Sequence, residues 1–168
     1  YLHRPNVDAV KYFISDIWPL IVENLPDCQF WIMGSNVPSE FYKLAGEKIK
    51  VIGYVADLSK VFSECKLSIA PLRYGAGIKG KIITSLSYGV PCVATPIAAE
   101  GMSLTHEYNV MLGDTPTHFT ESVVKLYTDS DLWDKVSENG LAYVKEKYSI
   151  GNFEKNLRFP FPQVERHN

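Results

Sequence analysis

Apolar residues recur at helical spacing near the amino end of the chain. They lie three or four positions apart, as on one buried face of a helix, and they are Val7, Val10, Ile14, Ile17 and Ile21. This pattern predicts an amphipathic helix over about residues 6–24. Pro19 lies inside it and lacks the N–H that a helix interior needs, so we expect a kink or a break there.

Short apolar runs bounded by glycine or proline predict five buried strands. They cover residues 28–33, 50–53, 66–70, 91–95 and 109–112. Helices are predicted at about 39–46, at the segment after Asp57 (which can cap it), from the glycine-rich segment to Tyr88, and at about 116–128, 130–146 and 150–158. Residues 159–168 contain two prolines and no apolar period, which predicts an irregular tail.

Strands that alternate with helices predict a parallel sheet covered on both faces, in a Rossmann-like, doubly wound α/β fold. We expect residues 1–158 to form this domain. The chain opens on a helix, whereas such folds normally begin with a strand, so we expect a fragment whose first strand lies upstream of Tyr1. Ligands of open parallel sheets bind beyond the carboxyl ends of the strands. Gly34, Tyr54, the 71–81 loop and the segment 95–101 follow predicted strands and are expected to line one cleft.

The segment from Pro71 to Lys81 carries the strongest chemical signal. It reads Pro-Leu-Arg-Tyr-Gly-Ala-Gly-Ile-Lys-Gly-Lys and leads into a predicted helix. Glycines leave backbone N–H groups unshielded, and a helix start adds partial positive charge. Lys79 and Lys81 add two full charges. This combination favours a phosphate or diphosphate ligand.

Two other interpretations of this loop stay open. Gly75-x-Gly77-x-x-Gly80 matches the dinucleotide fingerprint, with Glu100 about twenty residues later, so an NAD(P)-binding oxidoreductase domain is an alternative. The fingerprint glycines normally follow the first strand directly, whereas here several strand–helix units precede them. The loop is otherwise a surface segment with solvated lysines.

Composition narrows the function classes. The chain has 168 residues, of which 46% are hydrophobic, and this suits one packed domain. Its net charge of −2 provides no general electrostatic attraction for nucleic acid. No apolar run approaches the roughly 18 residues of a membrane span. Three cysteines without CxxC spacing predict reduced thiols in a cytoplasmic protein. The four histidines are scattered, so we predict no metal site.

Ten short motifs, taken in order, resemble one family. They are Arg4-Pro-Asn-Val-Asp8, Ile17-Trp-Pro19, Phe30-Trp-Ile-Met-Gly34, Val51-Ile-Gly-Tyr-Val55, Ala70-Pro71, Gly75-x-Gly77-x-x-x-Lys81, Gly89-Val-Pro91, Val93-Ala-Thr95, Glu100-Gly101 and Tyr148-Ser149. This series is similar to the carboxy-terminal domain of GT-B glycosyltransferases, in the group 1, family 4 set. The resemblance covers nearly the whole chain up to about residue 158.

The resemblance implies a domain that binds a UDP- or GDP-sugar as substrate, with no other cofactor. It implies transfer of a hexose-type sugar to an acceptor hydroxyl, without a catalytic metal and with a retaining outcome. A glycan, lipid or protein acceptor would be held by an amino-terminal domain outside this chain, in a pathway such as polysaccharide biosynthesis. The expected location is the cytoplasm or the inner face of the membrane, as a peripheral protein.

The resemblance also implies roles for particular residues. Lys81 and Lys79 are the expected catalytic residues. Glu100 is a third candidate because of its position, since it follows Thr95 at a strand end within reach of a sugar in the cleft; the alternative is a solvated loop acid. The expected donor-binding residues are Gly34, Tyr54, Val55, Arg73, Gly75, Ala76, Gly77, Gly80 and Thr84. Among them, Tyr54 and Val55 would flank the base. Ala76 and Thr84 stand where many relatives carry two glutamates, so a third hypothesis is a non-catalytic, glycosyltransferase-like scaffold.

Overall fold

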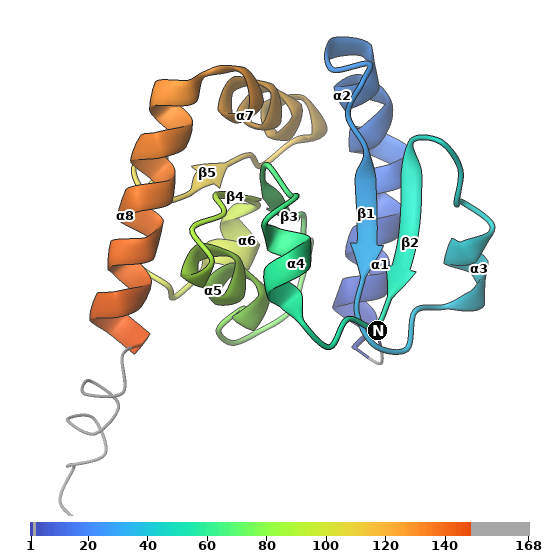
Figure 1. Cartoon of the computed structure of the whole chain (residues 1–168), viewed down its shortest axis with the longest axis horizontal. Coiled ribbons are helices and arrows are strands. Elements are labelled where there is room, and N and C mark those ends of the chain that lie inside the picture. Colours follow the sequence, from blue (N-terminus) through green and yellow to red (C-terminus); the bar gives the residue numbers. More distant parts are fainter. Residues whose placement is uncertain (2, 149–168) are drawn as a thin grey trace, which may run out of the picture.

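Pro19 is accommodated in the first helix by a widened turn. In this computed structural model, which describes Tyr1 and residues 3–148, the helix consists of α1 (Arg4–Tyr12), the π-helical turn η1 (Phe13–Ile17) and α2 (Trp18–Asn24) (Figure 1). The N–H of Trp18 bonds to the carbonyl of Phe13, one residue further back than in an α-helix. The helix predicted over 6–24 is therefore confirmed, and the irregularity expected at Pro19 is a π turn directly before it.

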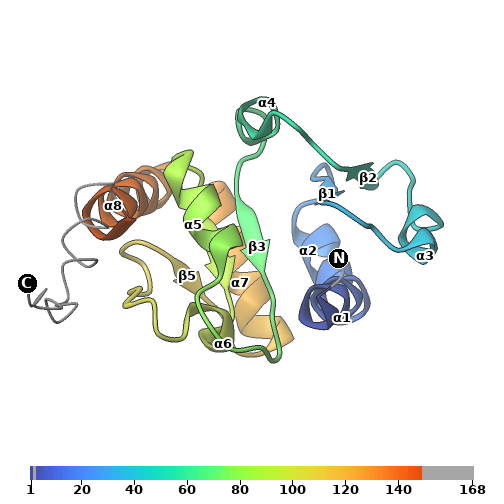
Figure 2. The ribbon, with the colours of Figure 1, turned by 90° about the horizontal axis from the view of Figure 1, so that it is seen from below.

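All five predicted strands form, and every pairing is parallel. They are β1 (Phe30–Met33), β2 (Ile49–Gly53), β3 (Ser68–Ala70), β4 (Cys92–Ala94) and β5 (Met111–Leu112). β1 pairs with β2, and β3, β4 and β5 pair in that order. The parallel α/β fold is confirmed, but the single sheet that we expected is divided into two, because β1 and β3 do not pair (Figures 1 and 2).

Among the described residues, six further helices connect and cover the strands. They are α3 (Ser39–Tyr42), α4 (Leu58–Phe62), α5 (Gly80–Ser87), α6 (Pro96–Ala99), α7 (Pro116–Thr128) and α8 (Ser130–Tyr148). Asp57 caps α4 as predicted, since its carboxylate accepts from the N–H of Ser59 at 3.1 Å. The helix predicted to reach residue 46 ends at Tyr42, because the N–H of Gly46 bonds to Ile49 in the turn into β2. The predicted helix 150–158 and tail 159–168 lie outside the described residues.

Phe13 links the two sheets through an aromatic cluster. Its ring centroid lies 4.6 Å from that of Phe30 in β1 and 6.3 Å from that of Phe119 in α7. Phe13 and Phe119 are buried, in a core cluster that also contains Val93 of β4. This apolar contact joins the two halves of the domain. All three cysteines are free thiols, and no helix within the described part of the chain is long and apolar enough to cross a bilayer.

Thr95, directly after β4, fixes both the short helix α6 and the approach to the glycine-rich loop. Its buried hydroxyl accepts from the N–H of Ala98 at 3.2 Å and donates to the carbonyl of Leu72, which follows β3. Neither α6 nor this bridge is visible in the apolar pattern, because four residues are too few to show a helical period. Thr95 therefore holds the ends of β3 and β4 in fixed positions.

We expect Thr95→Val to lower the free energy of unfolding by about 1–3 kcal/mol, because the buried carbonyl of Leu72 and the N–H of Ala98 lose their partner. Thr95→Ser keeps the hydroxyl and should lose clearly less. Urea denaturation of the two variants measures the difference. Equal losses in both would show that the hydroxyl contributes little.

Candidate functional site

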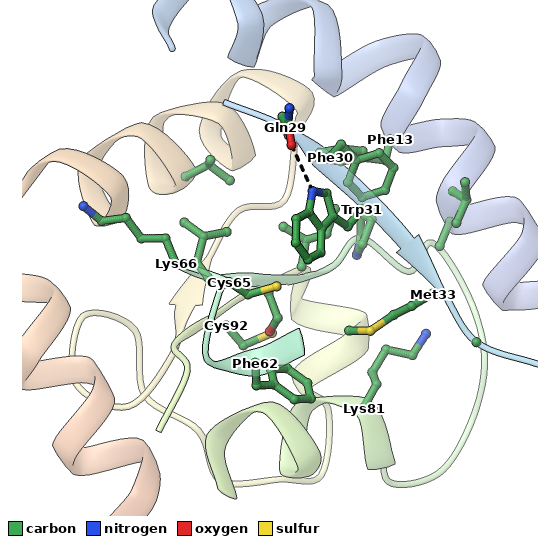
Figure 3. Close-up of a pocket in the computed structure, with 18 of the residues that line it drawn as sticks. Phe13, Gln29, Phe30, Trp31, Met33, Phe62, Cys65, Lys66, Lys81 and Cys92 are labelled. Carbon is green, nitrogen blue, oxygen red and sulfur yellow. Dashed lines mark hydrogen bonds between the residues drawn. The ribbon is translucent and has the colours of Figure 1, made fainter. Parts of the chain in front are cut away.

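A cavity of about 770 Å³ gathers five of the predicted site residues, four of them expected to bind the donor and one, Lys81, expected to be catalytic. Its lining includes Gly34 after β1, Tyr54 and Val55 after β2, and Lys81 and Thr84 of α5. These residues lie far apart in the sequence and meet because they follow or face the carboxyl ends of parallel strands. In Figure 3, Trp31 points into the middle of the cavity, with Lys81 and Met33 toward one end and Gln29 at the other.

Lys81 is the cation at the carboxyl end of this cavity. It lies in the first turn of α5, and its ammonium donates to the side-chain oxygen of Asn6 at 2.7 Å. Asn6 lies in the first turn of α1. The hydrogen bond therefore brings two helix starts, 75 positions apart in the sequence, to the same place.

Positive charge accumulates at this point. Burial lowers the pKa of Lys81, and the neighbouring charge of Lys79 acts in the same direction. Within the described part of the chain, neither lysine forms an ion pair with a carboxylate. His3 and Lys79, at the cap positions of α1 and α5, make no side-chain cap. The partial positive charge at the two helix starts is therefore not neutralised by a capping side chain, and it favours the binding of an anion.

Lys79 holds the glycine-rich loop in shape through two hydrogen bonds within the loop. Its ammonium donates to the carbonyl of Gly75 at 2.8 Å and to that of Gly77 at 2.7 Å. Both glycines have positive φ, +123° and +79°, which residues with a Cβ rarely adopt. The loop passes close to α1, since a Cβ on Gly75 would lie 3.4 Å from Pro5.

The remaining predicted site residues lie outside the cavity lining. They are Lys79, Glu100, Arg73, Gly75, Ala76, Gly77 and Gly80. The guanidinium of Arg73 bonds to both oxygens of Asp8, with Nε at 3.0 Å, and lies over the ring of Tyr12. Glu100 is exposed after α6. The roles proposed for these residues stay predictions, and the structure shows Arg73 engaged by a carboxylate of α1.

Sequence reasoning missed three residues at this site. Asn6 accepts a hydrogen bond from Lys81, Asp8 forms an ion pair with Arg73, and Tyr1 contributes to the cavity lining. Asn6 and Asp8 belong to the motif Arg4-Pro-Asn-Val-Asp8, but their partners are too distant in the sequence for any local pattern to reveal them. Within Tyr1 and residues 3–148, no group of three or more histidine, cysteine or acidic side chains is arranged to hold a metal ion.

Fold and site together define a class of protein. This is a parallel α/β domain of the Rossmann-like kind, with a cation and two helix starts at the carboxyl ends of its strands. The chain matches the family described as "Glycosyl transferases group 1" over residues 1–129. It therefore belongs to the group 1 glycosyltransferase family, as the sequence motifs indicated.

Three relatives illustrate this membership. An uncharacterized 44.6 kDa protein in the cps region of Klebsiella pneumoniae is 22% identical over 152 residues, which cover 85% of this chain and 39% of that protein. Anabaena Alr3699/HepE, solved in complex with UDP-glucose, has a TM-score of 0.69 at 14% identity, over 83% of this chain and 43% of HepE. The C-terminal domain of LpcC from Francisella tularensis, a group 1 family protein, has a TM-score of 0.65 at 19% identity. The match covers 78% of this chain and 75% of that one. The fold of this chain is thus that of a GT-B carboxy-terminal domain, and the chain spans about two fifths of the Klebsiella protein and of HepE.

We expect Arg73→Gln to destabilise the protein at neutral pH and to matter less in acid. The hydrogen bond from Arg73 holds the pKa of Asp8 below its ordinary value. The pair contributes its full stabilisation above about pH 4, the pKa of an aspartate in the unfolded chain. This stabilisation is lost as the pH falls through the lower pKa of Asp8 in the folded protein. Urea denaturation of both proteins between pH 7 and pH 3 measures this. A difference in stability that persists unchanged at pH 3 would contradict an ionic contact.

Proposed function

We propose that this chain is the donor-binding domain of a glycosyltransferase and that its site holds the diphosphate of a UDP- or GDP-sugar. The observation that carries the proposal is the position of Lys81. Its ammonium makes no ion pair among the described residues and reaches from the first turn of α5 to the first turn of α1. A diphosphate there would receive charge-assisted hydrogen bonds in a partly desolvated site.

The same geometry suits the chemistry of sugar transfer. When the bond between the sugar and the diphosphate breaks, negative charge develops on the leaving diphosphate. Lys81 and the start of α5 are fixed in advance by the hydrogen bond to Asn6 and by the bonds of Lys79 within the glycine loop. Preorganised donors of this kind stabilise developing charge without a metal ion. Metal-independent transfer is therefore part of the proposal.

Residues around Lys81 suit the rest of a nucleotide. Tyr54 is 73% exposed at the cavity, where its ring can stack on a base, and Val55 lines the cavity beside it. Thr84 lines the cavity three positions after Lys81, so its hydroxyl can bond to a ribose hydroxyl. Gly34 borders Tyr1 closely, with 3.1 Å from an added Cβ to the Tyr1 ring, so a side chain there would crowd the cavity mouth.

The activity of the whole protein is proposed by analogy with relatives. HepE has been solved with UDP-glucose, and the pneumococcal O-GlcNAc transferase GtfA with UDP and GlcNAc. We propose retaining transfer of a hexose-type sugar in polysaccharide biosynthesis. The acceptor, a glycan, lipid or protein, would be held by an amino-terminal domain. The proposed location is cytoplasmic or peripheral at the inner membrane face.

Two alternatives predict different ligands. An NAD(P)-dependent oxidoreductase would use Gly75-x-Gly77-x-x-Gly80, but the carbonyls of Gly75 and Gly77 are bonded to Lys79 and neither glycine lines the cavity. A non-catalytic scaffold is favoured by Ala76 and Thr84, which replace the two glutamates of the family pattern. The oxidoreductase predicts preference for NADH, and the scaffold predicts that no nucleotide binds.

We expect UDP or GDP to raise the melting temperature of this chain in the presence of EDTA, and NADH to have less effect. In Lys81→Met the shift should vanish, because the loss of a charge-assisted partner worth about 1.5–3 kcal/mol weakens binding roughly ten- to hundredfold. Differential scanning fluorimetry and calorimetric titration measure both effects.

Two comparisons make this test specific. Lys81→Met also removes the exposed hydrogen bond to Asn6, so we expect it to lower the free energy of unfolding by about 0.5–1.5 kcal/mol, and nucleotide binding to this variant is measured well below its melting temperature. Lys145→Met removes an exposed lysine of α8 and should bind nucleotides normally. If no nucleoside diphosphate shifts the parent chain, or if both variants lose binding equally, the donor-site assignment is wrong.

A further inference from the structure

The hydrogen bond between Lys81 and Asn6 fixes which way the Asn6 side chain points. A lysine ammonium can donate hydrogen bonds but cannot accept them. The group that faces Lys81 at 2.7 Å is therefore the amide oxygen of Asn6, and the amide nitrogen points away from Lys81. Because an amide nitrogen carries two N–H donors, Asn6 offers hydrogen bonds on the side that Lys81 does not occupy.

These two N–H donors have no partner in the described part of the chain. Asn6 is half-buried and lines the cavity, so its amide remains accessible to a ligand. Two other asparagines show the contrast. The side-chain amides of Asn24 and Asn139 each donate to a carbonyl of their own helix, at 2.8 Å in both cases. The amide of Asn6 is thus the one of these three that keeps its donors unused at a cavity.

The backbone at the start of α1 supplies fewer donors than a helix start normally does. Pro5 has no N–H, and the N–H of Asn6 bonds to the carbonyl of His3 at 3.0 Å. The side chain of Asn6 therefore adds donors at a turn whose own backbone offers few.

α1 meets two cations of the segment 71–81, and it meets them with different chemical groups. Asp8 faces Arg73 with a carboxylate, which accepts from Nε at 3.0 Å and cancels the charge of the guanidinium. Asn6 faces Lys81 with an amide, which accepts the hydrogen bond but carries no charge. A contact that only held α1 against α5 would be stronger with a carboxylate. The amide leaves the charge of Lys81 available to an anion.

The other two cations of this segment use donors within the protein. Lys79 donates to two loop carbonyls, and Arg73 donates to a carboxylate. Lys81 donates only to Asn6 among the described residues, and an ammonium has three donors. Lys81 and Asn6 are therefore neighbouring groups that both hold unused donors at the same end of the cavity.

We propose that Asn6 is a donor-binding residue with two functions: its amide oxygen orients Lys81, and its amide nitrogen donates a hydrogen bond to a phosphate oxygen of the diphosphate. One diphosphate would then receive donors from the first turns of both α1 and α5. The inference rests on the proposed function and adds a residue to that site. Because the amide is neutral, Asn6 holds Lys81 without competing with the ligand for its charge, whereas a carboxylate there would repel the diphosphate.

The direct test observes the side-chain amide of Asn6 by NMR in the isotope-labelled chain, where its resonance is the one that Asn6→Leu removes. We expect UDP or GDP to shift the Asn6 amide protons downfield, because hydrogen bonds to charged oxygens are short and strong. Uridine and guanosine, which lack phosphate, should leave them in place. The side-chain amides of Asn24 and Asn139 are internal references and should not move.

Substitutions of Asn6 separate its two functions. Asn6→Asp keeps an acceptor for Lys81 but replaces the free donors with negative charge, in a first helical turn where a carboxylate is favourable. We therefore expect Asn6→Asp to be at least as stable as the parent in urea and to bind UDP or GDP about a hundredfold more weakly. Asn6→Gln keeps both capacities and should bind better than Asn6→Leu, which has neither. Asn24→Asp, the same change at the other end of the first helix, should bind normally.

The outcomes distinguish this inference from the proposed function. If UDP or GDP binds and Lys81→Met abolishes binding, but the Asn6 amide does not shift, only the inference is overturned. Parent-like binding by Asn6→Asp overturns it too. If neither nucleotide binds, the proposed function is wrong, and inorganic pyrophosphate at millimolar concentration decides the inference. A saturable shift of the Asn6 amide with pyrophosphate then supports a diphosphate contact, and no shift overturns it.

Discussion

The contact between Lys81 and Asn6 fixes the geometry on which the proposed site depends. It joins the first turn of α5, which follows β3, to the first turn of α1, where the long first helix that carries Phe13 begins. Because β1 and β3 share no hydrogen bonds, the two halves are held by this contact, by the pair of Arg73 and Asp8, and by the aromatic cluster around Phe13. The first of these contacts lies where the donor diphosphate is proposed to bind.

The glycine-rich loop contributes to the proposed site by positioning the start of α5, because its own glycines do not line the cavity. Lys79 bonds to two of its carbonyls and Thr95 bonds to the carbonyl of Leu72, just before it. Positive φ at Gly75 and Gly77 allows the tight path that these bonds require. The loop thereby places the start of α5, and with it Lys81, at the cavity. The two neighbouring lysines have different roles: one holds the loop and the other faces the cavity.

The two ends of the cavity differ in their chemistry. Its carboxyl end is lined by Lys81, Asn6 and Thr84, which suit a charged ligand. The stretch between β1 and β3 is flanked by aromatic and aliphatic side chains. The proposed donor diphosphate therefore lies at the polar end of a cavity that is otherwise largely apolar.

Short apolar runs bounded by glycine or proline located the five strands, and helical periods long enough to be distinctive located the first helix, α7 and α8. The same pattern also placed Gly34, Tyr54 and Lys81 at strand ends, which parallel topology brings together. It could not reveal that Lys81 meets Asn6, that Asp8 holds Arg73, or that β1 and β3 stay apart, because these depend on residues about 40 to 75 positions distant, for which a local pattern carries no information. The sequence determined which elements form and which chemical groups they carry, and the packing of those elements decided which of these groups face one another.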